Sequence, residues 1–249
     1  SSISRVYPAG TRVNAQGRLE IGGCDAVELV ERFGSPTYVV AEDDLRMRAR
    51  GFAAAVSSRH RDYDVLFASK AFPCTAVYRS LAEEGLSCDV ASGGELYLAL
   101  RAGFHPSRIY LHGNAKSEAE LLQAVDEGVG HIVLDSFDDI ERLERVVRSF
   151  AGGRPPQDVL LRITPGVAGE THHAISTGQD DSKFGFSVSE AADAISRADG
   201  SESLSLAGLH FHIGSQLLQL SPFEEALESI AQLGDFPVYN VGGGLGVGY

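Results

Sequence analysis

Residues 64–73 read Asp-Val-Leu-Phe-Ala-Ser-Lys-Ala-Phe-Pro, an apolar run that ends in a lysine and then a proline. The apolar residues do not alternate with polar ones, which is typical of a strand buried on both faces of a parallel sheet. Similar runs recur at intervals of roughly 20 to 30 residues, each followed by an amphipathic stretch. The pattern predicts repeated strand–helix units.

The repeat predicts an α/β fold. Strands are expected at residues 37–41, 64–69, 87–91, 108–112, 131–135, 159–163, 206–212 and 237–241. Ser-x-x-Glu capping boxes beginning at Ser117 and Ser187, and a proline at position 222 after a serine, indicate helix starts between them. Eight strand–helix units favour a (β/α)8 TIM-type barrel, with a doubly wound sheet as the alternative. In both, the ligand lies beyond the carboxyl ends of the strands.

Residues 1–35 do not follow this repeat. Residues 10–14 and 18–21 are expected to form a small β segment, and residues 25–33 a short helix that ends before Gly34. We therefore expect this segment to pack separately from the strand–helix units.

Composition and charge exclude several classes of function. The 249 residues are 43% hydrophobic and carry a formal charge of −13, which disfavours nucleic acids and anionic membranes as partners. The apolar runs are far shorter than the roughly 20 residues of a membrane span. No stretch resembles a secretory signal, and three widely spaced cysteines fit reduced thiols, so a cytoplasmic location is expected.

Lysine is scarce in this chain. Of the 21 basic residues, three are lysines, namely Lys70, Lys116 and Lys183. Arginine serves equally well as a solvated surface cation, whereas lysine alone offers a primary amine that can act as a nucleophile. Each of the three is therefore a candidate for chemistry.

Lys70 follows an apolar strand and has phenylalanines nearby on both sides. Desolvation there would disfavour the ammonium form and make the amine a nucleophile for an aldehyde, which predicts Schiff-base chemistry. The alternative is a lysine that extends from a strand end into solvent.

A glycine-rich loop follows the last predicted strand. Residues 240–248 read Asn-Val-Gly-Gly-Gly-Leu-Gly-Val-Gly, and backbone amides in such a loop can hold a phosphate. The spacing matches neither the Gly-x-Gly-x-x-Gly dinucleotide fingerprint nor a nucleotide P-loop. A small phosphorylated ligand fits better.

His210 and His212 are two residues apart in a predicted strand, so both side chains face one side. Together with His172, His173 and Asp135 they could bind zinc in a metal-dependent hydrolase. Alternatively, one imidazole lies flat against an aromatic cofactor while the nearby Ser215 binds the cofactor's phosphate. They could also be core histidines satisfied by their neighbours.

Taken together, these motifs resemble the diaminopimelate decarboxylases, a group within the alanine-racemase-like (fold type III) class of pyridoxal 5'-phosphate (PLP) enzymes. Seven segments carry the resemblance in the same order: 67–71, 88–95, 111–116, 175–178, 182–185, 210–216 and 242–246. The Ile-Ser-Thr-Gly and His-Ile-Gly-Ser-Gln forms are closer to the diaminopimelate branch than to the ornithine branch.

The resemblance implies specific roles for residues in this chain. Lys70 would carry PLP covalently and His212 would stack on its ring. Ser215 and the glycine loop, Gly242, Gly243 and Gly244, would hold its phosphate. Asp89 and Arg162 would order the pocket. Apart from the resemblance, a long polar loop follows the sixth predicted strand, where substrate selection usually takes place, so Ser176, Thr177, Gly178 and Lys183 are expected to contact the substrate. The alternative is a solvated insertion. No metal is implied.

The resemblance also implies a function and a domain organisation. The expected reaction is the decarboxylation of meso-2,6-diaminopimelate to L-lysine and CO2 by a homodimer. The alternatives are another basic amino acid or polyamine precursor (ornithine, lysine, arginine or carboxynorspermidine) as substrate, an inactive PLP-binding fragment, or the zinc hydrolase. Residues 36–249 would form a PLP-binding barrel that is incomplete at its C-terminal end, with the strand before Lys70 as its first strand. Residues 1–35 would pack with an absent C-terminal β domain.

The chain departs from the family's pattern in three respects. It lacks the Glu-Pro-Gly-Arg segment, whose glutamate pairs with the pyridine nitrogen, and the C-terminal domain that supplies a Cys and a Tyr to the partner's active site. Asn240 also replaces the usual aspartate before the glycines.

Overall fold

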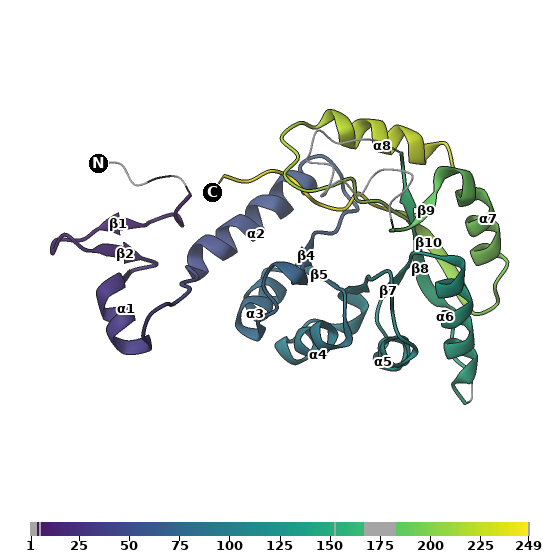
Figure 1. The fold of residues 1–249 in the computed structure, drawn as a ribbon, viewed down its shortest axis with the longest axis horizontal. Helices are drawn as coiled ribbons and strands as arrows, with labels where there is room; N and C mark the ends of the chain where they lie inside the picture. The colour runs from purple at the N-terminus through teal and green to yellow at the C-terminus, as the bar shows by residue number, and fades with distance from the viewer. Residues whose placement is uncertain (1–3, 5, 152, 167–182, 249) are drawn as a thin grey trace.

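The computed structural model describes residues 4, 6–151, 153–166 and 183–248. Its main feature is a curled parallel sheet with helices outside it (Figure 1). Seven strands follow one another along this sheet: β4 (Leu66–Ala68), β5 (Ser87–Val90), β6 (Ile109–Leu111), β7 (His131–Leu134), β8 (Gln157–Thr164), β10 (Leu204–His210) and β11 (Val238–Asn240). A two-residue strand, β9 (Phe186–Ser187), pairs with β8. The sheet is an incomplete TIM-type barrel, which confirms the predicted α/β class.

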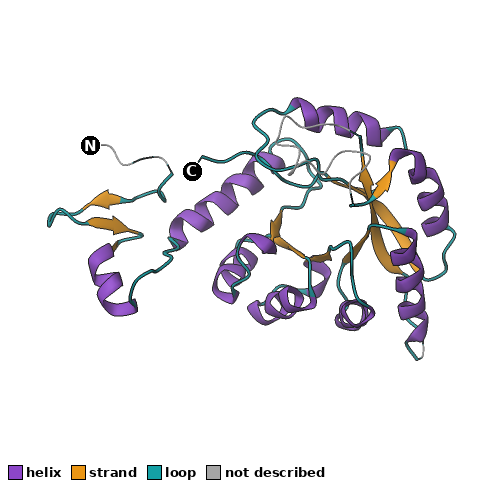
Figure 2. Cartoon of the chain, in the orientation of Figure 1, coloured by secondary structure: helices purple, strands orange, loops and turns teal. Residues whose placement is uncertain are grey.

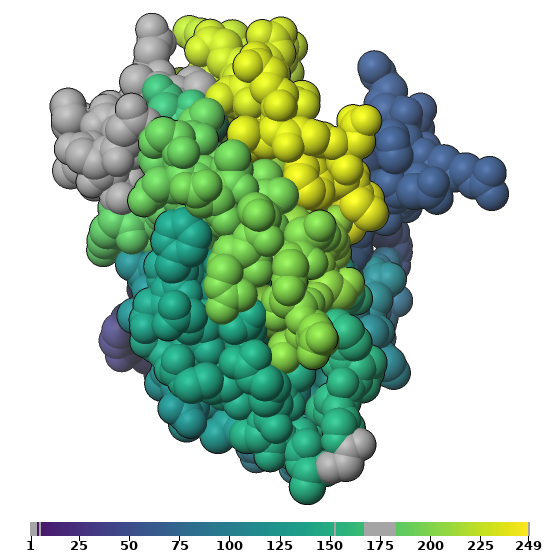
Figure 3. Space-filling model, turned by 90° about the vertical axis from the view of Figure 1, so that its right-hand side faces the viewer, coloured from purple at the N-terminus to yellow at the C-terminus, as the bar shows by residue number. Residues whose placement is uncertain are grey.

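Helices connect the strands and cover the outer face of the sheet (Figure 2). They are α2 (Glu42–Ser57), α3 (Thr75–Glu83), α4 (Gly93–Ala102), α5 (Glu118–Glu127), α6 (Phe137–Ser149), α7 (Val188–Asp199) and α8 (Ser221–Ala231), with short 3-10 turns at Ser69–Ala71 and Pro106–Arg108. The capping boxes predicted at Ser117 and Ser187 are present at the starts of α5 and α7. In the side view of Figure 3, residues of α6, α7 and α8 cover one outer face of the barrel.

The core lies between the sheet and these helices. Leu96 of α4, Leu121 of α5 and Ile132 of β7 are completely buried in it. Burial of each such side chain contributes about 1.5 to 3 kcal/mol to folding. A second, smaller cluster lies inside the curve of the sheet, where Tyr110, Val133 and Leu160 pack together. The two clusters bury both faces of the central strands, which explains why their sequences do not alternate.

The N-terminal segment forms the small β unit that was predicted. Strands β1 (Arg12–Val13), β2 (Leu19–Ile21) and β3 (Cys24–Asp25) make an antiparallel sheet of their own, followed by α1 (Ala26–Phe33). The Asp25 side chain caps α1 by accepting hydrogen bonds from two backbone N–H groups. None of the α1 residues is buried, and Figure 1 shows the segment standing apart from the barrel, joined to it through α2.

The prediction of a strand at residues 37–41 is wrong. These residues belong to no helix or strand, and Tyr38 is 98% exposed. Their apolar pattern resembles that of the true strands, but in the described part of the chain no neighbouring strand pairs with them. The sheet begins at β4, as the family resemblance implies.

The strand register brings the carboxyl ends of the barrel strands together. Ala68 of β4 pairs with Asp89 of β5, and His210 of β10 pairs with both Arg162 of β8 and Asn240 of β11. Residues at these ends therefore face one another across the mouth of the barrel. Within the described ranges, no helix is both long and apolar enough to cross a membrane.

Candidate functional site

A cavity of about 690 Å³ opens at the carboxyl ends of the strands. It brings together all eight residues to which the family resemblance gives a role at the cofactor: Lys70, Asp89, Arg162, His212, Ser215, Gly242, Gly243 and Gly244. His112, Asn114, Phe184 and His210 also line it. These residues come from strand ends spread along most of the chain, so the fold creates the site by aligning those ends.

Lys70 lies in the 3-10 turn that directly follows β4. The turn is anchored by the buried Ser69, whose hydroxyl donates a hydrogen bond to Glu95 Oε2 at 2.5 Å. Glu95 in turn accepts the backbone N–H of Ala91 at 2.7 Å. The backbone of Lys70 is thus fixed while its side chain lines the cavity.

The expected desolvation of Lys70 is not observed. The residue is exposed, and Phe72, which was expected to shield it, is itself 45% exposed. The physical reason is that β4 is an end strand of the open sheet, so no further described strand covers its outer side. Lys70 reaches the cavity from this open edge.

Asp89 and His112 lie side by side on neighbouring strand ends. His112 Nε2 is 3.6 Å from Asp89 Oδ2, and the His112 ring packs edge-on against His210 with ring centroids 4.8 Å apart. Burial raises the pKa of Asp89 to about 7, and although Lys70 opposes this shift, Glu95 adds to it. Asp89 can therefore hold or release a proton near neutral pH.

His210 and His212 line the same cavity, as their spacing predicted. His210 is buried, and its Nδ1 lies 3.1 Å from the carbonyl oxygen of Asn240. Burial, together with the positive charges of Lys70 and Arg162, lowers the pKa of His212 to about 4. His212 consequently presents an uncharged imidazole at neutral pH.

The zinc alternative has no support in the described residues. Among them, no group of three or more His, Cys, Asp or Glu side chains is arranged to hold a metal ion. Asp135 is instead engaged with Lys116 and Arg162. His172 and His173 lie outside the described residues.

The glycine loop has a backbone shape that side chains would disrupt. Gly242 and Gly244 have positive φ angles of 68° and 94°, and a Cβ on either would overlap the backbone of the neighbouring segment, at Phe211 and Gly214 respectively. Gly243 differs because nothing lies within 4 Å of where its Cβ would be. Its N–H points toward His212 Nδ1 at 3.4 Å. The loop therefore forms a side-chain-free cradle beside His212.

These residues fit PLP. The cradle places backbone without side chains at the cavity wall, where a phosphate can approach closely, and Ser215 lies exposed at the same wall with its hydroxyl. The neutral His212 offers a flat ring face for an aromatic ring, and Lys70 offers a primary amine for an aldehyde. Asn240, which replaces the family's usual aspartate, accepts the Gly242 N–H at 2.9 Å through its side-chain oxygen.

Two of the three lysines singled out in the sequence, Lys116 and Lys183, are not part of the cavity lining. Lys183 is exposed and is absent from the cavity lining, although its carbonyl oxygen accepts a hydrogen bond from Asn114 at 3.4 Å. Ser176, Thr177 and Gly178 lie outside the described residues. Lys116 is buried in ion pairs behind the cavity lining.

Sequence reasoning missed one aromatic residue of the cavity, Phe184. The Arg162 guanidinium carbon lies 4.4 Å from the centroid of the Phe184 ring. Phe184 belongs to a long polar loop, and a single aromatic residue in such a loop carries no signal of its own. The stacking depends on β9, which pairs with β8 and brings the end of that loop back to Arg162.

Comparison with known proteins assigns this site to a family. Residues 42–249 match the model of the pyridoxal-binding domain of pyridoxal-dependent decarboxylases. The chain belongs to this family. The domain that matches is the one that binds the cofactor, in agreement with the PLP site proposed from the sequence.

Among curated relatives, the chain is 45% identical to a diaminopimelate decarboxylase of Actinosynnema pretiosum over 92% of this chain and 50% of the relative. Among solved structures, it is similar to diaminopimelate decarboxylase from M. jannaschii, with a TM-score of 0.85 and 31% identity over 96% of this chain and 57% of that one. The enzyme from Helicobacter pylori, solved with L-lysine, gives a TM-score of 0.82 and 31% identity over 90% of this chain and 57% of that one. The chain thus spans about half the length of the curated relatives it matches.

Proposed function

We propose that this pyridoxal-dependent decarboxylase chain forms the cofactor-binding barrel of an enzyme that converts meso-2,6-diaminopimelate into L-lysine and CO2. One observation carries the proposal: Lys70, His212 and the glycine loop line a single cavity although they lie far apart in the sequence. The similarity to diaminopimelate decarboxylases over most of the chain supports this substrate over ornithine or arginine.

In this proposal each residue of the site has a defined task. Lys70 holds the cofactor covalently through its amine, and His212 supports the cofactor ring with its neutral face. Ser215 and the amides of the loop Gly242 to Gly244 bind the phosphate. Asp89 and Arg162 order the charges around Lys70.

The reaction breaks one carbon–carbon bond of the substrate. The carboxylate leaves as CO2, and a proton takes its place on the same carbon. Bound PLP supplies an electron sink for the pair released in that step. Asp89 lies beside the amine-bearing turn, and since its pKa is about 7 it can keep a proton within the site at neutral pH.

Several further expectations belong to this proposal. Ser176, Thr177, Gly178 and Lys183 would contact the substrate from the long loop after β8. Residues 1–35 would pack with a C-terminal β domain, and the exposed apolar residues of α1, Val27, Val30 and Phe33, supply a surface for it. The full-length protein would act as a cytoplasmic homodimer, and its three free cysteines are compatible with a reducing compartment.

The test is cofactor attachment. The protein at its full natural length should bind PLP with a visible absorbance band, and borohydride should fix the cofactor to Lys70, as shown by peptide mass spectrometry. Lys70→Ala should abolish the adduct. Lys183→Ala is the matched control, because Lys183 is exposed and lies outside the cavity lining, and it should leave the adduct unchanged.

Substrate choice is tested separately by measuring CO2 release with diaminopimelate, ornithine, lysine and arginine. Diaminopimelate should give the highest kcat/KM. An unchanged adduct in Lys70→Ala would refute the assigned attachment site, and preference for another amino acid would refute the proposed substrate.

A further inference from the structure

Lys116 is a buried lysine that the proposed reaction does not use. Its side chain is 2% exposed and lies in the loop between β6 and α5. The Nζ donates hydrogen bonds to the carbonyl oxygen of Gly113 and, at 2.8 Å, to Asp139 Oδ2. Burial of an ammonium group costs free energy unless the charge is paired. A lysine kept at such a position therefore needs a structural or functional reason.

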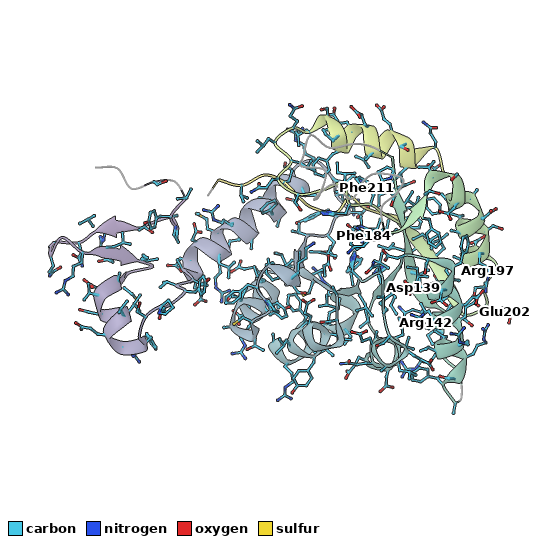
Figure 4. All side chains as sticks on the ribbon, viewed as in Figure 1. Asp139, Arg142, Phe184, Arg197, Glu202 and Phe211 are labelled. Carbon is cyan, nitrogen blue, oxygen red and sulfur yellow. The ribbon has the colours of Figure 1, made fainter. Side chains whose placement is uncertain are left out.

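The contacts of Lys116 lead from α6 to the cavity. Lys116 Nζ is 3.9 Å from Asp135 Oδ1, and Asp135 Oδ2 is 3.5 Å from Arg162 Nη1. Arg162 lines the cavity and carries the Phe184 ring over its guanidinium. Opposite charges thus alternate from Asp139 through Lys116 and Asp135 to Arg162. In Figure 4, Asp139 lies on the side of α6 that faces the sheet, and Phe184 lies inside the curve of the sheet.

We propose that Lys116 and Asp135 are positioning residues that hold the Arg162 guanidinium in the cofactor cavity. The inference rests on the proposed function, since it assumes that this cavity binds PLP. It assigns no direct contact with PLP to either residue.

Asp135 is the link that depends on Lys116. Its side chain is 3% exposed, and among the described residues no group donates a hydrogen bond to its Oδ1, which faces Lys116 Nζ. Burial raises the pKa of Asp135, while Lys116 and Arg162 oppose this rise. Without Lys116, two buried carboxyl groups, Asp135 and Asp139, would lie together with less positive charge to balance them. Asp135 would then take up a proton and no longer hold Arg162 by charge.

The backbone around Arg162 depends on the same carboxyl group. The Gly185 N–H also favours the charged form of the Asp135 carboxyl group and helps to hold down its pKa. Gly185 follows Phe184 and lies so close to Arg162 that a Cβ would come within 2.6 Å of the Arg162 carbonyl oxygen. Asp135 therefore contacts the guanidinium directly, and the segment that stacks upon the guanidinium is packed against the Arg162 backbone.

The test is a double-mutant cycle on PLP affinity, measured by spectrophotometric titration of the protein at its full natural length. Lys116→Met keeps much of the side-chain length and removes the charge. We expect it to weaken PLP binding about tenfold, which is within the range for coupled ion-pair networks. In an Arg162→Met background the same substitution should have no further effect, because the residue on which it acts is already gone.

The control is Arg197→Met. Arg197 pairs with the buried Glu144 of α6 at 2.6 and 2.7 Å, and it lies at the outer rim of the barrel in Figure 4. This variant also removes an ion-pair partner from α6, but it should lower the unfolding temperature without changing PLP affinity. If Lys116→Met does not fold, Asp135→Asn, which is nearly isosteric, is predicted to give the same loss and the same dependence on Arg162.

The outcomes separate the two proposals. A full-length wild-type protein that does not bind PLP would refute the proposed function and this inference with it. Wild-type binding combined with unchanged affinity in both Lys116→Met and Asp135→Asn would overturn the inference alone. An equal loss of affinity with and without Arg162 would also overturn it, because the effect would then not pass through Arg162.

Discussion

Substitution of Gly244 by alanine should weaken cofactor binding roughly a hundredfold. Gly244 has a φ of 94°, a region that costs a residue with a Cβ about 1 to 2 kcal/mol. The added Cβ would also overlap the carbonyl oxygen of Gly214, which is backbone and cannot move aside as a side chain could. The loop must therefore leave its observed path.

The displacement breaks contacts that hold the loop. The Leu217 N–H donates to the Gly244 carbonyl oxygen at 2.9 Å, and the Gly246 N–H donates to the Leu217 carbonyl oxygen at 2.9 Å. Each bond contributes about 1 kcal/mol net. Together with the φ cost, the loss of these bonds raises the free energy of the present loop conformation by about 3 kcal/mol relative to other conformations. If only this conformation binds the phosphate, PLP affinity falls roughly a hundredfold.

Two glycines provide matched controls. Gly17 also has a positive φ, 74°, but nothing lies near its Cβ position and it is remote from the cavity, so Gly17→Ala should leave PLP affinity unchanged. Gly243→Ala has no overlap, so its unfolding temperature should equal that of wild type. Its methyl group would nevertheless narrow the cradle, and PLP affinity should fall by less than in Gly244→Ala.

The assay combines spectrophotometric PLP titration with thermal unfolding of each variant. Wild-type PLP affinity in Gly244→Ala would refute the reasoning, because it would show that the phosphate does not require this backbone path. Equal losses in all three variants would refute it as well, since the losses would then not follow the local geometry.

Three further predictions concern charge. Because the pKa of His212 is lowered to about 4, its ring should titrate near that value by NMR. Between pH 6.5 and 4 the unfolded chain binds a proton at His212 that the folded protein does not, so the free energy of unfolding should decrease as pH falls through this range. An NMR midpoint near 6.5 would contradict the burial argument. The pKa of Asp89 is raised from 3.8 to about 7. Between these pH values the folded protein keeps a proton on Asp89 that the unfolded chain releases, so this residue's contribution to stability declines as pH rises from 3.8 to 7. Thermal unfolding of Asp89→Asn should lack this decline. Arg197→Met should cost about 1 to 2 kcal/mol in urea unfolding at neutral pH, because it leaves the buried Glu144 carboxylate without its bidentate partner. The pKa of Glu144 is lowered to about 2, so this pair stabilises the fold fully above 4.5 and is lost as pH falls through 2; a variant as stable as wild type at pH 7 would refute this assignment.

Much of the fold was predictable because the barrel strands share a strong pattern. The runs 65–68 and 132–134 are apolar on both faces, since helices cover one face and the barrel interior the other. The run at 37–41 has the same composition but is not a strand. A strand requires a partner for its backbone, and local sequence does not reveal whether one is available.

The cofactor site was predictable at its backbone-determined positions and less so elsewhere. The glycines of the loop 242–244 are required by positive φ angles and close approach, which composition reveals directly. By contrast, the exposure of Lys70 depends on its place at the edge of an open sheet, and the stacking of Phe184 on Arg162 depends on strand pairing across a long connection. Both are tertiary properties, so patterns within single segments do not contain them.

The three lysines show what separates a chemical amine from a structural one. All three stood out because arginine is the usual cation of this chain, yet the structure places them in different surroundings. Lys70 lines the cavity, Lys116 is enclosed by Asp135 and Asp139, and Lys183 is exposed with its Nζ 5.1 Å from the centroid of the Phe184 ring. An amine can attack an aldehyde only where it is accessible and not fully engaged as a hydrogen-bonded ammonium ion. Lys70 meets this condition inside the cavity, whereas Lys116, at the same end of the barrel, is held as a cation between carboxylates. The scarcity of lysine therefore identifies positions where arginine does not replace it. The surroundings of each amine determine whether lysine is needed there for its reactivity or for the compact shape of its charged group.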